Sequence, residues 1–327
     1  MSVVEQFYKA VIINSTEVND FVDKNTKWHV SAPVNEVSSM DDWIQACWLP
    51  LTKAFEGIER RTFISLSEVE NDVKWTFSTG VFVGNFNSPL FGIPHTGKAA
   101  YLRFTEMVAE RDGKIIEGYT ILDMLDLMEQ AGVNPLRKSL GKSGTILPPS
   151  TLDGVNPPFD SKEQGQITKQ LVIDMLNELG RFDGESLSSM KLENYWDPNF
   201  IWYGPAGIGT TRGIEDFRQQ HQGPFVFSFP DRIVDHHTAF IAQGNYAATG
   251  GWPHMHGTHS CGGWLGLPPS GKYLELRVMD IWRREGNLLK ENWVAIDLVH
   301  MCEQMGLDVF AMMHTLSNGN NGANCGD

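Results

Sequence analysis

The feature that most constrains this sequence is an internal repeat, which keeps one spacing over most of the chain. Leu102 and Arg103 recur 174 positions later as Leu276 and Arg277. The turn sequence GIPHTGK at 92–98 recurs at the same spacing as GLPPSGK at 266–272. A long repeat of this kind is one structural unit present twice. We therefore predict two copies of one domain within the 327 residues.

Further pairs at this spacing define the extent of the repeat: Trp28 and Trp202, Asp42 and Asp216, Phe55 and Phe229, Glu117 and Glu291, Asp123 and Asp297, Gly132 and Gly306. We predict domain 1 at 1–140 and domain 2 at 163–316. The segment 141–162 is rich in proline and small polar residues, which is typical of a linker. The tail 317–327 (SNGNNGANCGD) has almost nothing to bury, so we expect it to be disordered.

Each copy has the same expected order of elements. Helices at 3–14 and 163–179 precede aromatic segments at 27–30 and 200–203. A short helix follows near Asp42 and Asp216, then four strand-like runs, then a final helix. Asp123 and Asp297 suit the N-caps of the final helices, and Gly132 and Gly306 suit their C-terminal ends. Helices gathered on one side of an antiparallel sheet make an α+β domain.

Composition narrows the class of protein. A formal charge of −14 argues against nucleic acid as a partner, because phosphates favour a basic surface. No apolar run approaches the roughly 20 residues of a membrane helix, and the N-terminus lacks the pattern of a signal peptide. The cysteines are scattered (Cys47, Cys261, Cys302 and Cys325). These features predict a cytoplasmic protein with free thiols and no membrane partner.

An acidic residue lies among apolar side chains on one predicted strand face. Successive side chains of a strand alternate between its two faces. Asp280 therefore shares a face with Leu274, Leu276, Val278 and Trp282. The first copy repeats the pattern, with Glu106 among Ala100, Leu102, Phe104 and Val108. Such a carboxylate is either an acid–base group whose pKa is raised by burial or a structural partner of an arginine or of backbone amides.

Other candidates are less specific. Asp297 repeats as Asp123 and is a catalytic candidate, although an aspartate at a helix start is first an N-cap. His259 could hydrogen-bond to substrate or to Asp280. His254, His256 and His259 could alternatively bind a metal, but their spacing matches no closed zinc pattern, so we predict none.

Aromatic side chains of domain 2 are core residues by default, and a subset could stack on a flat or cyclic ligand. Arg103 and Arg277 lie on the strand face opposite the acids, where we expect them to pair across the sheet or at an interface. The predicted substrate-binding residues are Trp202, Tyr203, Phe217, His221, Trp252, Trp264, Trp282 and Trp293, with Glu106 in the first copy.

Several of these segments resemble one family. They are GTH at 257–259, GLPPSG at 266–271, MDIWR at 279–283 and ENW at 291–293, with GIPHTG at 92–97 and DGKIIE at 112–117 in the first copy. The pattern resembles the SnoaL-like polyketide cyclases. This resemblance implies a nuclear-transport-factor-2-like (NTF2-like) fold, in which a curved sheet and helices form a cone around an apolar pocket. Founding members close a polyketide ring by aldol condensation without metal or cofactor.

The resemblance also locates the family's polar positions in this chain. The catalytic aspartate of the founding members falls on Thr120 and Val294, and a pocket asparagine falls near Trp28 and Trp202. A pocket histidine falls on Glu106 and Asp280, which keep an ionisable group.

Three functions follow as hypotheses. The first is a cofactor-free lyase or isomerase for a small apolar carbonyl or polyketide-like compound, with Asp280, His259 and Asp297 as catalytic candidates in domain 2. The second is a binding or assembly module that has lost the cyclase aspartate. The third is a metal enzyme that uses the histidines. Single-domain relatives often dimerise through their sheets, so we also expect an intramolecular pseudo-dimer, with further homo-oligomers open.

Overall fold

The computed structural model describes residues 2–13, 16–155, 157, 161–234 and 236–321. Parts of the sequence-based expectations fall outside these ranges: the end of the first helix at Asn14, linker positions 156 and 158–160, and tail positions 322–327. Within the described ranges, no helix combines the length and the apolar character needed to cross a membrane.

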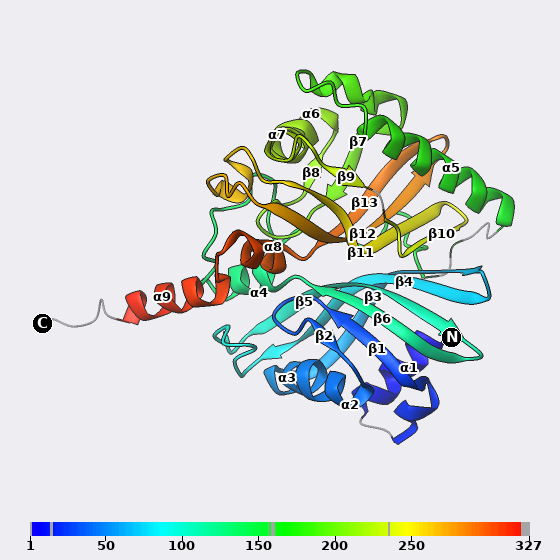
Figure 1. Ribbon diagram of the computed structural model, residues 1–327. Coiled ribbons are helices and arrows are strands. Elements are labelled where there is room, and N and C mark those ends of the chain that lie inside the picture. The colour runs from blue at the N-terminus through cyan, green and yellow to red at the C-terminus, as the bar shows by residue number, and fades with distance from the viewer. Residues whose placement is uncertain (1, 14–15, 156, 158–160, 235, 322–327) are drawn as a thin grey trace, which may run out of the picture.

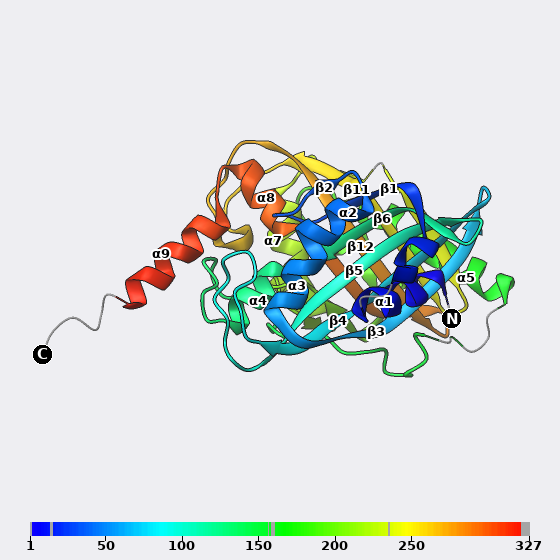
Figure 2. The same ribbon diagram turned by 90° about the horizontal axis from the view of Figure 1, so that it is seen from below.

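The first copy forms a six-stranded sheet with the order β2-β1-β6-β5-β4-β3. Its strands are β1 (Val22–Val30), β2 (Glu36–Val37), β3 (Phe55–Glu70), β4 (Val73–Phe86), β5 (Ala99–Arg111) and β6 (Lys114–Leu122). One face carries α1 (Val3–Ile12), α2 (Met40–Trp43) and α3 (Leu49–Ala54), which lie in front of the sheet in Figure 2. The helix α4 (Met124–Gln130) follows β6.

The second copy repeats this arrangement with shorter strands at one edge. Its sheet has the order β10-β11-β12-β13-β7-β8, with β9 paired to β11. The strands are β7 (Trp196–Tyr203), β8 (Thr211–Arg212), β9 (Ile233–Val234), β10 (Ala239–Gln243), β11 (Tyr246–Thr258), β12 (Tyr273–Glu285) and β13 (Leu288–Ile296). The helices are α5 (Lys162–Leu179), α6 (Ile214–Phe217), α7 (Gly223–Ser228), α8 (Leu298–Met305) and α9 (Val309–Asn321).

The α+β prediction is confirmed, with one addition. Most neighbouring strands run antiparallel, but β1 runs parallel to β6, and β7 runs parallel to β13. In each copy, the first long strand (β1 or β7) thus lies beside the last strand (β6 or β13) and runs in the same direction. Hydrophobic alternation reports which face a residue occupies and not which strand lies next to it, so this pairing was not predictable from the pattern.

The predicted ends of the final helices are also confirmed. The Asp123 side chain accepts a hydrogen bond from the backbone N–H of Asp126 at 3.1 Å, and Asp297 accepts one from His300 at 3.1 Å. Gly132 and Gly306 follow with φ of 73° and 92°, a backbone region that favours glycine. The C-terminal expectation needs a correction, because α9 continues to Asn321 and the segment from 317 is therefore helical at first.

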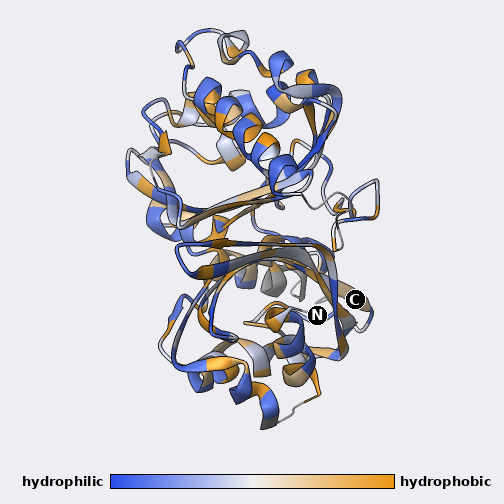
Figure 3. Ribbon diagram, turned by 90° about the vertical axis from the view of Figure 1, so that its right-hand side faces the viewer, coloured by the Kyte–Doolittle hydropathy of each residue, from blue (hydrophilic) through white to orange (hydrophobic). Residues whose placement is uncertain are grey.

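The two sheets lie face to face in the middle of the molecule, with α1–α3 outside one sheet and α5–α7 outside the other, while α4 and α8 lie together at one end of the junction (Figures 1 and 3). Apolar side chains from both inner faces form one cluster, which we call the intersheet core. Its largest members are Phe77, Met107, Tyr119, Tyr203, Tyr246, Met279, Ile281 and Trp293. Each sheet has an apolar face that is unfavourable in water, and the two faces remove one another from water by packing together.

Polar contacts across this interface come in pairs that follow the repeat. The N-cap Asp297 accepts a hydrogen bond from the backbone N–H of Ala32 at 3.1 Å, and Asp123 accepts one from that of Ala206 at 2.9 Å. Ala32 and Ala206 are separated by the repeat spacing of 174. The contact is therefore reciprocal, as at the interface of a two-fold symmetric dimer.

The repeated arginines also lie at this interface, as the sequence suggested. Arg103 donates to the backbone carbonyls of Tyr203, Gly204 and Val294 at 2.7–2.8 Å. Arg277 donates to the Asn35 side chain of the other domain at 2.8 Å. The two arginines therefore tie each sheet to the backbone or side chains of its neighbour.

The linker is bound along both domains. The backbones of Lys142 and Thr210 exchange hydrogen bonds of 2.8 and 3.0 Å. Ser150 donates to the Glu291 carboxylate in domain 2, and the Gly154 carbonyl accepts from Ser65 in domain 1 at 2.9 Å. These contacts hold the connection against the junction of the two sheets.

Candidate functional site

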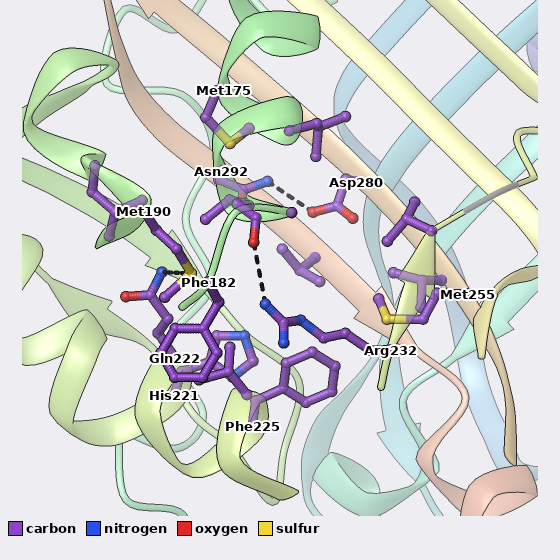
Figure 4. A pocket seen from close by; sticks show the side chains of 18 of the residues that line it. Met175, Phe182, Met190, His221, Gln222, Phe225, Arg232, Met255, Asp280 and Asn292 are labelled. Carbon is purple, nitrogen blue, oxygen red and sulfur yellow. Dashed lines mark hydrogen bonds between the residues drawn. The ribbon is translucent and has the colours of Figure 1, made fainter. Parts of the chain in front are cut away.

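A cavity of about 490 Å³ lies inside domain 2, between the outer face of its sheet and the helices that cover it. The strand β12 contributes Leu276, Val278, Asp280 and Trp282 to its wall, as the alternation along the strand predicts. Further walls come from the end of α5, the π-helical segment Arg218–Gln222 between α6 and α7, α7 itself, β9 and β13. Figure 4 shows the lining side chains.

Asp280 is the acid of this cavity. Its Oδ1 accepts a hydrogen bond of 3.2 Å from the Asn292 side chain, which reaches across from the neighbouring strand β13 (Figure 4). Burial raises the pKa of Asp280 to about 7, and the hydrogen bond from Asn292 opposes that rise. The carboxyl group is therefore divided between its acidic and basic forms near neutral pH, as a proton-transfer group requires.

The strand register places Asp280 next to the family's aspartate position. Asp280 on β12 pairs directly with Val294 on β13. Side chains of directly paired residues lie on the same face with Cβ atoms about 4.5–5.5 Å apart. The carboxylate of Asp280 thus occupies nearly the same part of the cavity that a side chain at position 294 would reach.

Amides and imidazoles also line the cavity. His221 stacks on Trp202 with ring centroids 4.1 Å apart, and burial lowers its pKa to about 3, so it is uncharged. The Gln222 amide donates to the Met190 sulfur at 3.5 Å. The rings of His237 and His254 share a hydrogen bond of 2.9 Å.

One arginine also reaches into the cavity. Arg232 precedes β9, and its Nη2 donates to the backbone carbonyl of Leu179, the last residue of α5, at 3.2 Å. Its guanidinium lies 5.8 Å from the centre of the Phe182 ring.

Domain 1 uses the equivalent acid differently. Glu106 is fully buried, forms an ion pair with Arg60, and accepts a hydrogen bond of 2.8 Å from the Tyr8 hydroxyl. The Arg60 guanidinium lies between the rings of Tyr8 and Phe104, at 4.2 and 4.3 Å from their centres. Glu106 is therefore the structural carboxylate that the sequence offered as the alternative reading.

The register explains why only domain 1 contains this ion pair. Leu102 pairs with Phe82, which pairs with Arg60. The repeated Leu276 pairs with Met255, which pairs with Val234. Val234 therefore takes the place of Arg60 in domain 2, and Asp280 lacks that cation.

A second difference opens the interior of domain 2. In domain 1 the Trp28 ring lies directly on Gly118, where an added Cβ would be 2.6 Å from it. At the repeat spacing, Gly118 becomes Asn292. The ring of Trp202 turns instead against Gly204, where an added Cβ would be 1.9 Å away. The space that Trp28 fills in domain 1 is thus part of the cavity in domain 2.

The structure separates the predicted substrate-binding residues into groups. Trp202, Phe217, His221 and Trp282 line the cavity. Tyr203 and Trp293 belong to the intersheet core, on the opposite face of the sheet, and Trp252 packs against that core. Trp264 packs on Phe225 and Phe229 outside the lining, and Glu106 lies in domain 1. Sequence alternation alone does not say which sheet face meets the other domain.

Two catalytic candidates lie away from Asp280. His259 is fully buried, its Nδ1 lies 3.3 Å from the Ser270 hydroxyl, and its ring stacks on Phe229. It is not among the residues that line the cavity, and the structure shows a contact with Ser270 in place of the expected one with Asp280. Asp297 caps α8 and binds Arg277 and Ala32 at the interface, so it acts in the structure as a cap and a contact between domains.

The histidines proposed as an alternative metal site do not converge. His254 pairs with His237, His256 stacks near Tyr273, and His259 contacts Ser270. Across the described part of the chain, no three His, Cys, Asp or Glu side chains gather closely enough to hold a metal ion.

Sequence reasoning missed Asn292, Arg232, Gln222 and the methionines of the cavity wall. A signal existed for Asn292, because it replaces Gly118 at the repeat spacing and so marks a place where the copies diverge. Arg232 lies in a short loop without periodicity, and its inward direction depends on the contacts of that loop.

Comparisons with known proteins agree with the repeat. The profile of the family described as SnoaL-like polyketide cyclase matches residues 2–131 and again 182–305. Similar solved structures include IdmH of Streptomyces antibioticus, at 19% identity and a TM-score of 0.34, covering 40% of this chain and 96% of that one. Another is an NTF2-like protein of Burkholderia xenovorans LB400, at 16% identity and a TM-score of 0.34, covering 43% and 97%. No curated protein sequence matches the chain.

Proposed function

Because the chain belongs to the SnoaL-like polyketide cyclase family, we propose that its second domain is a cofactor-free acid–base catalyst. The substrate is a small, largely apolar carbonyl or polyketide-like compound, and the reaction is a lyase or isomerase step in which Asp280 moves the proton. One observation carries this proposal: a carboxyl group with a pKa of about 7 lies in an apolar cavity large enough for such a ligand.

The position of Asp280 supports the assignment despite the loss of the family's aspartate. Val294 cannot exchange protons, but its direct cross-strand neighbour Asp280 can. An acid moved by one strand reaches nearly the same point in the cavity. The proposed catalytic acid thus lies on β12, directly beside the family's aspartate position on β13.

In the proposed step, the Asp280 carboxylate takes a proton from a carbon next to the substrate carbonyl. The electron pair of that C–H bond moves into an enolate, which then forms or breaks the next bond or is reprotonated by the Asp280 carboxylic acid. Asn292 is a positioning residue, because both protons of its amide are used, one by Asp280 at 3.2 Å and one by the Ile281 carbonyl at 3.1 Å.

Exchange of α-protons with deuterium in D₂O tests this step without knowledge of the full substrate. A panel of cyclic and aromatic ketones and 1,3-diketones would be followed by NMR. We expect the wild-type chain to accelerate exchange for some members and Asp280→Asn to lose that acceleration. Glu275→Gln, an exposed acid on the same strand, is the matched control. Full exchange activity in Asp280→Asn would refute the assignment.

A second candidate function is a binding module without catalysis. It is favoured by Thr120 and Val294, which leave both copies without an acid at the family's aspartate position. The same exchange experiment separates the two functions. Ligands that bind the domain 2 cavity without any accelerated exchange would support the binding module.

We further propose that the chain is an intramolecular pseudo-dimer. The intersheet core and the reciprocal contacts of Asp123 and Asp297 are what a pair of identical domains would form in a homodimer. In this proposal, one copy keeps the open cavity while the other, filled by Arg60 and Trp28, serves as its structural partner.

A further inference from the structure

We infer that the ligand of the domain 2 cavity carries a carboxylate, and that Arg232 binds it. The inference builds on the proposed function, since it specifies the substrate class of the same cavity: a carbonyl compound with an apolar body and an anionic group at one end. It rests on the position, the pairing and the surroundings of Arg232.

Arg232 is held in place by its neighbours along β11. The preceding residue, Asp231, accepts hydrogen bonds from the backbone N–H and the hydroxyl of Thr258 at 2.7 and 2.6 Å. Gly257 lets the strand approach closely, because an added Cβ would lie 3.1 Å from the Arg232 Cα. On the other side, Ile233 pairs with His256 of β11, so the loop is held before and after the arginine.

The guanidinium is only partly satisfied by the protein. It donates to the carbonyls of Leu179 and Phe229, at 3.2 and 3.5 Å. A guanidinium has five N–H donors, so others remain for a ligand. Figure 4 shows Arg232 and Asp280 reaching into the same space from different elements.

Within the described ranges, no ion pair joins Arg232 to a carboxylate, whereas other arginines of this region are paired. Arg181, which also lines the cavity, is paired with Glu178, and Arg218 is paired with Glu193. Burial of Arg232 lowers the pKa of its guanidinium, which reflects the cost of removing a charge from water. A ligand carboxylate would remove that cost.

The remaining walls define the rest of the ligand. Phe182, Phe225 and Met255 surround the arginine with apolar surface. A carboxylate is best bound away from Asp280, because a second negative charge would oppose ionisation of the catalytic acid. A flat apolar body between Arg232 and Asp280 meets both conditions.

The test compares an acid with its own ester, using 2-naphthoate and methyl 2-naphthoate as probes of the full-length chain. Binding is followed through the fluorescence of Trp202 and Trp282, which line the cavity. We expect the acid to bind on the order of tenfold more tightly than the ester, as a charge-assisted bidentate contact should. Arg232→Gln should remove this preference and leave ester affinity unchanged, while exposed Arg212→Gln should behave as wild type.

Equal affinity for acid and ester in the wild type, or an unchanged preference in Arg232→Gln, would overturn the inference. If Arg232→Gln does not fold, Arg232→Lys decides, because a point charge should keep only part of the preference. Neither probe has an exchangeable α-proton, so the outcome is independent of catalysis. A preference for the carboxylate without proton exchange would support this inference and refute the proposed function. Proton exchange without that preference would support the proposed function and refute this inference.

Discussion

At the scale of single residues, one position carries two different roles in the two copies. Glu106 and Asp280 occupy equivalent places on equivalent strands, yet Glu106 faces Arg60 and Asp280 faces an amide. The change of Arg60 to Val234 removes the cation, and the change of Gly118 to Asn292 supplies the amide. The chemistry of the acid is thus set by residues on neighbouring strands.

The raised pKa of Asp280 predicts how stability depends on pH. An unfolded aspartate titrates near ~3.9, whereas Asp280 in the folded chain titrates at about 7. Between these values the folded state holds the extra proton, so raising the pH destabilises it. We expect the thermal midpoint of Asp280→Asn, relative to wild type, to rise from pH 4 to pH 7 and then level off. If the difference in thermal midpoint stays constant with pH, folding does not raise the pKa of Asp280.

The ion pair of domain 1 predicts a large effect of Arg60→Met. This change leaves the fully buried Glu106 without its cation, which costs about 3–5 kcal/mol of unfolding free energy. Adding Glu106→Gln to the variant should restore most of the loss, because the uncompensated charge is then gone. Urea unfolding measures the free energy of unfolding of the single and the double variant. If Arg60→Met is as stable as the wild type, the ion pair does not stabilise domain 1.

At the scale of elements, patterns along the chain predicted the helices and strands well. The N-caps at Asp123 and Asp297 were readable because capping depends on residues three positions apart. The face of β12 that carries Asp280 was readable because strand alternation is strict. The parallel pairing of β1 with β6 was not, since it depends on contacts between distant segments.

The N-cap of α4 should contribute more to the free energy of unfolding than an N-cap that stabilises only its own helix. Asp123 also accepts a hydrogen bond from Ala206 in the other domain, so Asp123→Ala breaks a helix end and an interdomain contact together. Ser161→Ala is the control, because exposed Ser161 caps α5 through Gln164 alone. We expect about 1 kcal/mol for Ser161→Ala and clearly more for Asp123→Ala in urea unfolding. Equal losses would show that the interdomain bond adds nothing.

At the scale of the whole molecule, the two sheets act as each other's cover. The intersheet core takes Tyr203 and Trp293, which the sequence had offered as ligand contacts, and leaves Trp202 and Trp282 to the cavity. Strand β7 shows this division directly, because Tyr203 faces the other domain and the adjacent Trp202 faces the ligand space.

This interface should hold without the covalent connection. Leu152, in the linker, is 79% exposed, so a protease site inserted there can be cut in the folded chain. We expect the nicked halves to elute together in size-exclusion chromatography with light scattering, because the apolar faces of both sheets would otherwise meet water. Ile281→Asp, which buries a charge in the intersheet core, should let them separate. Separation of the unaltered halves would refute this account.

The sequence by itself determined the duplication, the α+β class, the helix caps and the strand face that carries Asp280. These features depend on residue spacing along one segment, which the chain displays directly. Only the tertiary structure decided which acid has a cation as its partner and which has an amide, which aromatics line the cavity, and that His259 contacts Ser270. Those outcomes depend on which strands become neighbours and which sheet faces meet, and so on contacts between residues far apart in the chain.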